Sequence, residues 1–165
     1  MWFTQLGWGA PVTGIFWDYE NVPLRHTDWE DFLHGLRAYV NSNQVIFARV
    51  YVRKATLPIK DRELINALNI FDYKWIRKDD PNAADYSLIQ SCLDVLKIHS
   101  QINHVLLVFG DADFLELTDQ LHEWQVAISL ICQSRNYSED LRSEVHYAYS
   151  VHFVASHPQD WWLYR

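Results

Sequence analysis

HVLLVFGDADFLEL, residues 104–117, joins an apolar run to two carboxylates and then to a helical pattern. No polar residue interrupts Val105–Phe109, which is typical of a strand covered on both faces of a parallel sheet. Gly110 ends the run, and Asp111 and Asp113 follow it. Open α/β sheets bind ligands beyond the carboxyl ends of their strands. The stretch therefore predicts a buried strand that delivers two acids to a ligand-binding edge.

Strands and helices are predicted to alternate along the rest of the chain. The expected strands are 12–17, 44–52, 71–76, 105–109, 126–131 and 148–154, and the expected helices are 28–40, 58–68, 80–98, 112–123 and 139–142. Alternation of this kind predicts an α/β fold with right-handed crossovers and a central, mostly parallel sheet of five or six strands. The expected strand order is 3-2-1-4-5, which makes strands 1 and 4 neighbours at the point where the chain reverses direction.

The totals predict one globular domain. The chain has 165 residues, 49% hydrophobic and 21% charged, which excludes a disordered polymer. We expect a leader over residues 1–11, the domain over 12–156 and a tail over 157–165. No signal peptide or membrane span is predicted. Two cysteines without a CxxC motif indicate buried thiols, and we expect a cytoplasmic protein.

Charge is unevenly distributed. The net charge is −7, yet residues 49–78 carry eight basic against three acidic side chains, a net +5. Such a segment suits a phosphate-bearing substrate, although solvated lysines on helix surfaces explain it equally well. The candidates for phosphate contact follow strands 2 and 3: Arg53, Lys54, Arg77 and Lys78.

Three elements are expected to bring acids to one edge of the sheet. The first strand ends at Asp18, the fourth is followed by Asp111 and Asp113, and a helix that follows the third strand carries Asp85 in its first turns. Several neighbouring carboxylates stay ionised only with a cation, and their hard oxygen atoms favour Mg²⁺ or Mn²⁺. Such a centre is suited to hydrolysis of a phosphodiester.

Each acid also has a purely structural interpretation. Asp18 and Asn21 suit a turn, Asp111 and Asp113 suit the start of a helix, and Asp85 suits a solvated helix surface. The eight histidines form no ligand pattern, and no P-loop, HExxH or GxSxG motif is present.

The acids and their neighbours resemble the NYN family of PIN-like nucleases. The matching pieces are Asp18-Tyr19-Glu20-Asn21, then Asn82-Ala83-Ala84-Asp85 opening a helix, then Val108–Phe114 (VFGDADF), in order over about residues 12–154. Three positions depart from the family pattern: Ser91 stands where many members carry an aspartate, and Pro81-Asn82 replaces a Gly-Lys pair.

The resemblance implies a PIN-like three-layer fold and a metal-dependent endoribonuclease acting on single-stranded or structured RNA. It makes Asp18, Asp85, Asp111 and Asp113 the catalytic metal-site acids, with Mg²⁺ or Mn²⁺ as cofactor. Asn21 would orient a ligand or the substrate phosphate. A homodimer through exposed aromatic side chains is a further expectation.

Two other functions remain open. A haloacid-dehalogenase-like phosphatase also uses an aspartate after strand 1, but Glu20 stands where its second acid is normally aspartate. A non-catalytic RNA- or protein-binding module would keep the fold, and Trp17, Tyr19 or Trp75 would then stack on bases, although core packing explains each of these rings as well.

Overall fold

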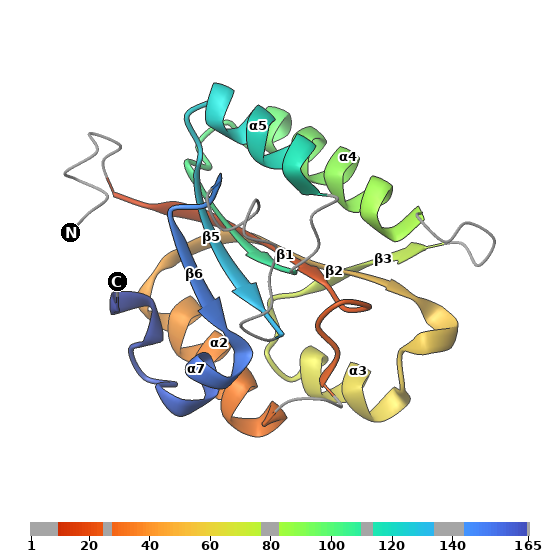
Figure 1. Cartoon of the computed structure of the whole chain (residues 1–165). Coiled ribbons are helices and arrows are strands. Elements are labelled where there is room, and N and C mark those ends of the chain that lie inside the picture. Colours follow the sequence, from red (N-terminus) through yellow and green to blue (C-terminus); the bar gives the residue numbers. More distant parts are fainter. Residues whose placement is uncertain (1–9, 25–27, 77–82, 110–113, 134–143, 165) are drawn as a thin grey trace.

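Six parallel strands form one sheet in the order β3-β2-β1-β4-β5-β6 (Figure 1). The computed structural model describes residues 10–24, 28–76, 83–109, 114–133 and 144–164, without the side chains of Lys54 and residues 83–87. The strands are β1 (Val12–Asp18), β2 (Gln44–Arg53), β3 (Asp72–Ile76), β4 (His104–Val108), β5 (Ala127–Cys132) and β6 (Tyr147–Ser150). The predicted parallel sheet and its order are confirmed, with β6 added at the β5 edge.

Helices cover both faces of the sheet, so the molecule has three layers. Helices α4 (Ala83–Ile98) and α5 (Leu115–Glu123) lie on one face. The other face carries α2 (Trp29–Ser42), α3 (Ile59–Asn66) and α7 (Val151–Ser156). Short 3₁₀ turns, η2 (Lys54–Thr56) and η4 (Trp161–Leu163), follow β2 and α7.

Alternation along the strands divides the core into two clusters. Phe16, Tyr51 and Leu107 point toward α4 and α5, and Trp17 and Val50 point toward the opposite helices. All five side chains are fully buried. β1 and β4 read as unbroken apolar runs because they occupy the middle of a sheet that is covered on both sides.

The prediction of a strand over 148–154 is wrong in its second half. β6 ends at Ser150, and α7 begins at Val151. The Ser150 side chain accepts a hydrogen bond from the main-chain nitrogen of Phe153 at 3.0 Å, which is the N-cap arrangement. Val151, Val154 and Ala155 are buried at helical spacing.

The segment predicted as a tail reaches the core. Trp161 is fully buried, and its indole donates a hydrogen bond to the main-chain oxygen of Gly35 on α2 at 2.9 Å. A Cβ on Gly35 would lie 2.7 Å from Cγ1 of Val154, so α2 and α7 approach closely at a position that only glycine fits.

A buried polar network crosses the amino-terminal half of the sheet. His104 lies between Thr13 and Ser129, and its ring nitrogens are 2.9 and 2.8 Å from their hydroxyl oxygens. Burial lowers the pKa of His104 to about 3, with a smaller contribution from His146. The imidazole is therefore neutral at ordinary pH.

This histidine predicts a loss of stability in mild acid. The folded chain keeps His104 neutral, whereas the imidazole of the unfolded chain takes up a proton near pH 6.5. The contribution of His104 to the free energy of unfolding is therefore fully present above that pH and is lost below it. From pH 6.5 to 5 the expected loss is about 2 kcal/mol. Urea unfolding at both pH values measures it. A His104→Gln variant should show a slope smaller by about one proton, and an unchanged slope would contradict the prediction.

Candidate metal centre

Asp18 lies at the point where the order of the strands reverses. It is the last residue of β1, which pairs with β2 on one side and with β4 on the other. Trp17 is in register with Val108, the last residue of β4, and Asp18 is in register with Tyr51 on β2. Asp18 therefore occupies the carboxyl edge at the topological switch point, where open α/β sheets bind ligands.

The turn after β1 is fixed by hydrogen bonds. The main-chain nitrogen of Val22 donates to the main-chain oxygen of Asp18 at 3.1 Å, and the Trp17 indole donates to the oxygen of Val22 at 2.9 Å. These contacts hold Asn21 above Asp18, and its side-chain amide donates to Oδ2 of Asp18 at 2.9 Å. The arrangement brings together two of the residues selected from the sequence.

The Asp18 side chain is completely buried. Removing an ionised carboxylate from water is costly unless a cation, a proton or several donors compensate for its charge. A buried carboxylate at a strand end, oriented by a neighbouring amide, has the chemistry of an oxygen ligand for a hard divalent cation. Asp18 and Asn21 therefore fit the predicted metal centre.

The side chains of the other predicted acids lie outside the described part of the molecule. Asp111 and Asp113 fall in residues 110–113, outside the described ranges, and for Asp85 only the backbone is described, in the first turn of α4. α4 covers the sheet face toward which Phe16 and Tyr51 point. Among the described residues, no group of three or more His, Cys, Asp or Glu side chains could hold a metal.

The predicted basic contacts are described only in part. Arg53 ends β2, Lys54 is described as backbone in η2, and Arg77 and Lys78 lie outside the described residues. The sequence reasoning did not select Lys74, which is exposed on β3 and in register with Tyr51. Its position on the same row and face as Asp18 follows from strand alternation once the register is known.

Glu20 serves the loop after β2. Its carboxylate accepts hydrogen bonds from the main-chain nitrogen of Arg53 at 3.0 Å and from the Thr56 hydroxyl at 2.6 Å. Glu20 therefore holds η2 against the turn after β1, and this structural role accounts for its side chain without a phosphatase site.

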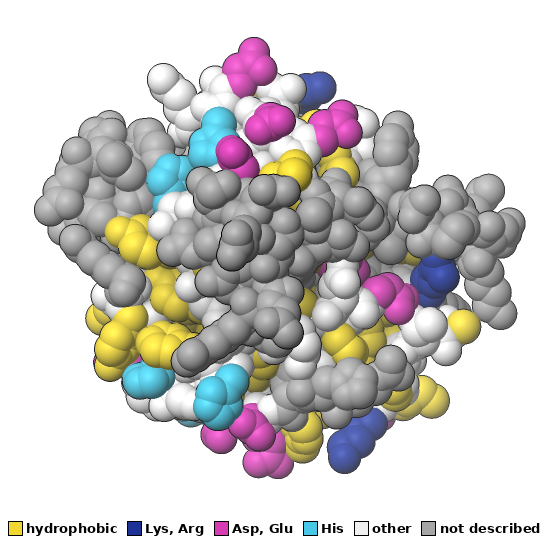
Figure 2. All heavy atoms as spheres, in the orientation of Figure 1, with side chains coloured by type: hydrophobic (Ala, Val, Ile, Leu, Met, Phe, Trp, Pro, Cys, Tyr) yellow, Lys and Arg dark blue, Asp and Glu magenta, His cyan; other side chains and the backbone are white. Residues whose placement is uncertain are grey.

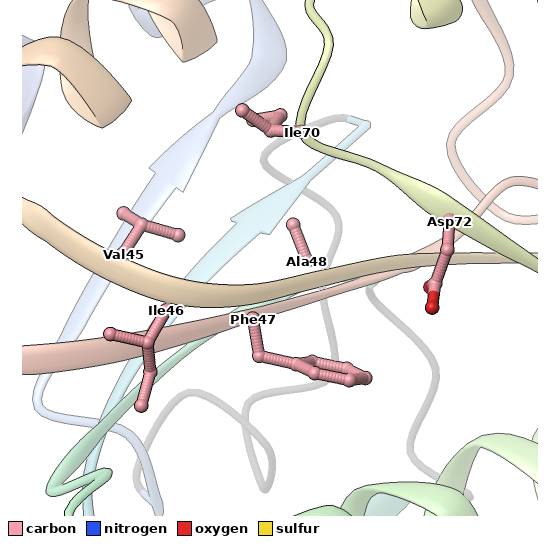
Figure 3. Close-up of a pocket in the computed structure, with 6 residues that line it drawn as sticks. All are labelled: Val45, Ile46, Phe47, Ala48, Ile70 and Asp72. Atoms are coloured by element: carbon pink, nitrogen blue, oxygen red, sulfur yellow. The ribbon is translucent and has the colours of Figure 1, made fainter.

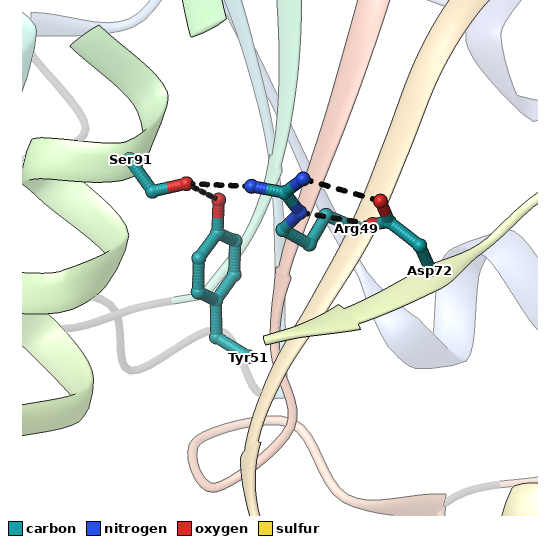
Figure 4. Close-up of polar contacts among 4 residues, drawn as sticks. All are labelled: Arg49, Tyr51, Asp72 and Ser91. Carbon is teal, nitrogen blue, oxygen red and sulfur yellow. Dashed lines mark hydrogen bonds and ion pairs between the residues drawn. The ribbon is translucent and has the colours of Figure 1, made fainter. Parts of the chain in front are cut away.

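Ser91 joins a polar cluster between α4 and β2 (Figure 4). Its hydroxyl oxygen accepts hydrogen bonds from the Tyr51 phenol at 2.6 Å and from Arg49 at 3.0 Å. Arg49 also forms a two-point ion pair with Asp72 at 2.9 and 3.1 Å, and this pairing raises its pKa. Burial raises the pKa of Tyr51 to about 12, so the phenol remains a donor. The serine thus anchors α4 to the sheet.

Two hollows flank this cluster at the β3 edge of the sheet. One, of about 440 Å³, includes Arg49, Lys74 and Ser91 in its lining. The other, of about 360 Å³, lies where β2 extends beyond the start of β3 (Figure 3). It is lined by Val45, Ile46, Phe47, Ala48, Ile70 and Asp72. Neither lining includes Asp18, so neither hollow is the predicted centre.

The aromatic side chains near the centre divide into core and surface. Trp17 packs edge-on against Phe32 and Phe71, and the Tyr19 hydroxyl donates to Asp61. Trp17 and Tyr19 are both buried, so the suggestion that they stack on bases is wrong. Trp75 is 38% exposed and remains available.

Comparison with known proteins agrees with this topology. A sequence model of the family described as the NYN domain matches residues 12–152. A crystal structure of a protein of unknown function from Vibrio parahaemolyticus is similar over 86% of this chain and 93% of its own, with a TM-score of 0.65 and 18% sequence identity. A search of curated proteins finds no match. No helix in the described ranges is long and apolar enough to cross a membrane.

Proposed function

The chain belongs to the NYN domain family of PIN-like nucleases, and from this premise we propose that it is a divalent-metal-dependent endoribonuclease. The observation that carries the proposal is the place of Asp18, a fully buried carboxylate at the switch point of a parallel sheet, with Asn21 hydrogen-bonded to it. Family membership supports a nuclease, and the buried oxygen ligand supports a metal-dependent one.

The acids of the chain would hold the cation. Asp18, Asp85 and Asp111 are the proposed ligands, and Asp113 would bind a second ion or a ligand water. When bound, Mg²⁺ or Mn²⁺ supplies a water of lowered pKa and neutralises charge on the phosphate. Asn21 keeps the Asp18 carboxylate in one orientation through its 2.9 Å hydrogen bond.

Basic residues beside the acids would bind the RNA backbone. Arg53, Lys54, Arg77 and Lys78 follow the carboxyl ends of β2 and β3 in sequence. Lys74 joins them because its register places it two strands from Asp18, about 10 Å away at the usual strand spacing. Figure 2 shows Lys and Arg side chains on the right of the molecule, where β3 and the end of β2 lie in Figure 1.

The decisive experiment is cleavage of a labelled single-stranded RNA. Wild-type protein should cut it internally with Mn²⁺ or Mg²⁺ and fail to cut it with EDTA. Asp111→Asn should reduce the rate at least ~100-fold, because removing even an outer partner of a metal site typically costs 10–100-fold. A variant that cleaves as fast as wild type in Mn²⁺ would refute the assignment of this acid.

A non-catalytic RNA- or protein-binding module is the second candidate. It is favoured by Ser91, which is bonded to Tyr51 and Arg49 at a position where the family often has an acid. Binding of RNA without cleavage under any divalent metal would support this candidate over the nuclease.

Location and assembly are part of the proposal. Cys92 and Cys132 are both buried thiols, and burial raises the pKa of Cys132 to about 11. Buried thiols of this kind suit a reducing compartment, and we propose a cytoplasmic protein. The homodimer expected from exposed aromatic side chains stays a prediction.

A further inference from the structure

Two aromatic rings and a guanidinium form a stack at the β3 edge of the sheet. The rings of Tyr73 and Trp75 are nearly parallel, at 5°, with their centroids 5.2 Å apart. The guanidinium carbon of Arg62, on α3, lies 5.1 Å from the Trp75 ring centroid and 5.7 Å from that of Tyr73. We call Arg62, Tyr73 and Trp75 the edge stack.

The lower part of the edge stack is held rigidly. The Tyr73 hydroxyl donates to Oδ1 of Asn66 at 2.7 Å and approaches the main-chain oxygen of Arg62 at 3.3 Å. Strand alternation places Tyr73 and Trp75 on the same face of β3, above the end of α3. The exposed Trp75 ring therefore lies against a Tyr73 ring that α3 holds in place.

Trp75 itself is not explained by packing. Trp75 is 38% exposed, whereas most of the largest apolar side chains of this sheet are fully buried. Within the described residues its indole nitrogen makes no hydrogen bond. A rigid, exposed indole beside a cation presents a flat surface that stacks on another π system and a positive charge that attracts an anion.

The stack lies toward the same end of the sheet as the proposed centre, on the other face. Trp75 is in register with Val52, one residue beyond Tyr51, which is in register with Asp18. The Trp75 backbone thus lies two strands from Asp18, about 10 Å away, and one residue closer to the carboxyl edge, but its side chain points to the opposite face of the sheet, toward α3. A chain that places a phosphate at Asp18 and passes over the carboxyl edge toward β3 would bring a more distant group onto the indole.

Resting on the proposed function, we propose that the edge stack binds an unpaired nucleobase of the RNA, at the point where the strand leaves the centre over the β3 edge of the sheet. Every base has a face that stacks on an indole, and Arg62 adds attraction for the backbone. The basic segment 49–78, which contains the whole stack, matches the charge of such a ligand. Because bases in a duplex are already stacked and paired, only an unpaired base can use this surface.

Binding of short labelled RNA, measured by fluorescence anisotropy in EDTA so that no cleavage occurs, tests this inference. Trp75→Leu should weaken binding about tenfold or more, since one base–aromatic stack accounts for roughly 5- to 150-fold. Trp75→Phe, which keeps a ring, should lose only a few-fold. The matched control is Trp124→Leu: Trp124 is 37% exposed but follows α5 at the amino end of the sheet.

A ligand that keeps its phosphates but lacks bases separates stacking from charge. Wild-type protein should bind an abasic oligomer more weakly than normal RNA, and Trp75→Leu should bind the two alike. Equal binding by Trp75→Leu and Trp124→Leu would overturn the proposal for the edge stack, and so would duplex RNA that competes as well as single strands. In either case, cleavage by the wild type would still support the nuclease. Absence of both binding and cleavage of RNA by the wild type would overturn both.

Discussion

Replacing Asp18 with asparagine is expected to slow RNA cleavage by more than ~100-fold while the protein stays folded. Loss of an outer partner of a metal ligand typically costs 10–100-fold, and Asp18 is proposed as a ligand itself. Asparagine has nearly the same shape and retains an oxygen that can accept the hydrogen bond from Asn21. The substitution therefore removes the negative charge and leaves the local contacts.

Although Asp18→Asn should cleave RNA more slowly, it should be no less stable than the wild type. Asp18 is fully buried at an edge where the chain is expected to gather further acids, so its charge opposes folding when no cation is present. Without metal, Asp18→Asn should unfold at the same urea concentration as wild type or at a higher one. Added Mn²⁺ should stabilise the wild type and leave the variant unchanged, because a ligand stabilises only a state that binds it.

Two companion variants make the experiment specific. Asn21→Ala should lose roughly 10–100-fold in rate, because the carboxylate remains but is no longer oriented. Asp119→Asn, an exposed acid on α5, should cleave like the wild type. If Asp18→Asn cleaves as fast as Asp119→Asn in Mn²⁺, the assignment of the centre is wrong.

The topology was predictable because it depends on patterns local to each element. The apolar run Val105–Leu107 predicted a strand covered on both faces, and its side chains are fully buried. Alternation of strands and helices predicted parallel pairing, which β4 makes with β1 and with β5. The order of the strands then placed Asp18 at the switch point without any side-chain information. The contact of Asn21 with Asp18 is also predictable, because a tight turn brings together residues that are three positions apart.

What the sequence could not reveal depends on pairings between distant residues. Trp17 and Trp75 look alike in sequence, yet a central strand buries the first and an edge strand exposes the second. Ser91 meets Arg49 across 42 positions, and no local pattern indicates such a bond. The helix at Val151 was missed because its short apolar pattern fits a strand until Ser150 is recognised as its N-cap.

Trp161→Ala is expected to lower the free energy of unfolding by about 3–5 kcal/mol, the usual cost of removing a fully buried large aromatic side chain. The Trp161 ring stacks on Tyr39 at 5.2 Å and meets Tyr149 edge-on at 5.1 Å. Its indole also satisfies the main-chain oxygen of Gly35. Alanine would leave a cavity between α2, β6 and α7, and close helix contacts limit how far the cavity can collapse.

Urea unfolding at pH 7 measures this loss, and two variants separate its causes. Trp161→Phe keeps most of the ring and loses the hydrogen bond, so it should cost about 1–2 kcal/mol beyond the change in volume. Leu163→Ala, at a side chain that is 65% exposed, should change stability by less than about 0.5 kcal/mol. If Trp161→Ala proves as mild as Leu163→Ala, residues 157–165 are a tail, as the sequence suggested. A large loss would instead make Trp161 the residue that closes the α2 face of the sheet, and the folding unit would then extend at least to that position.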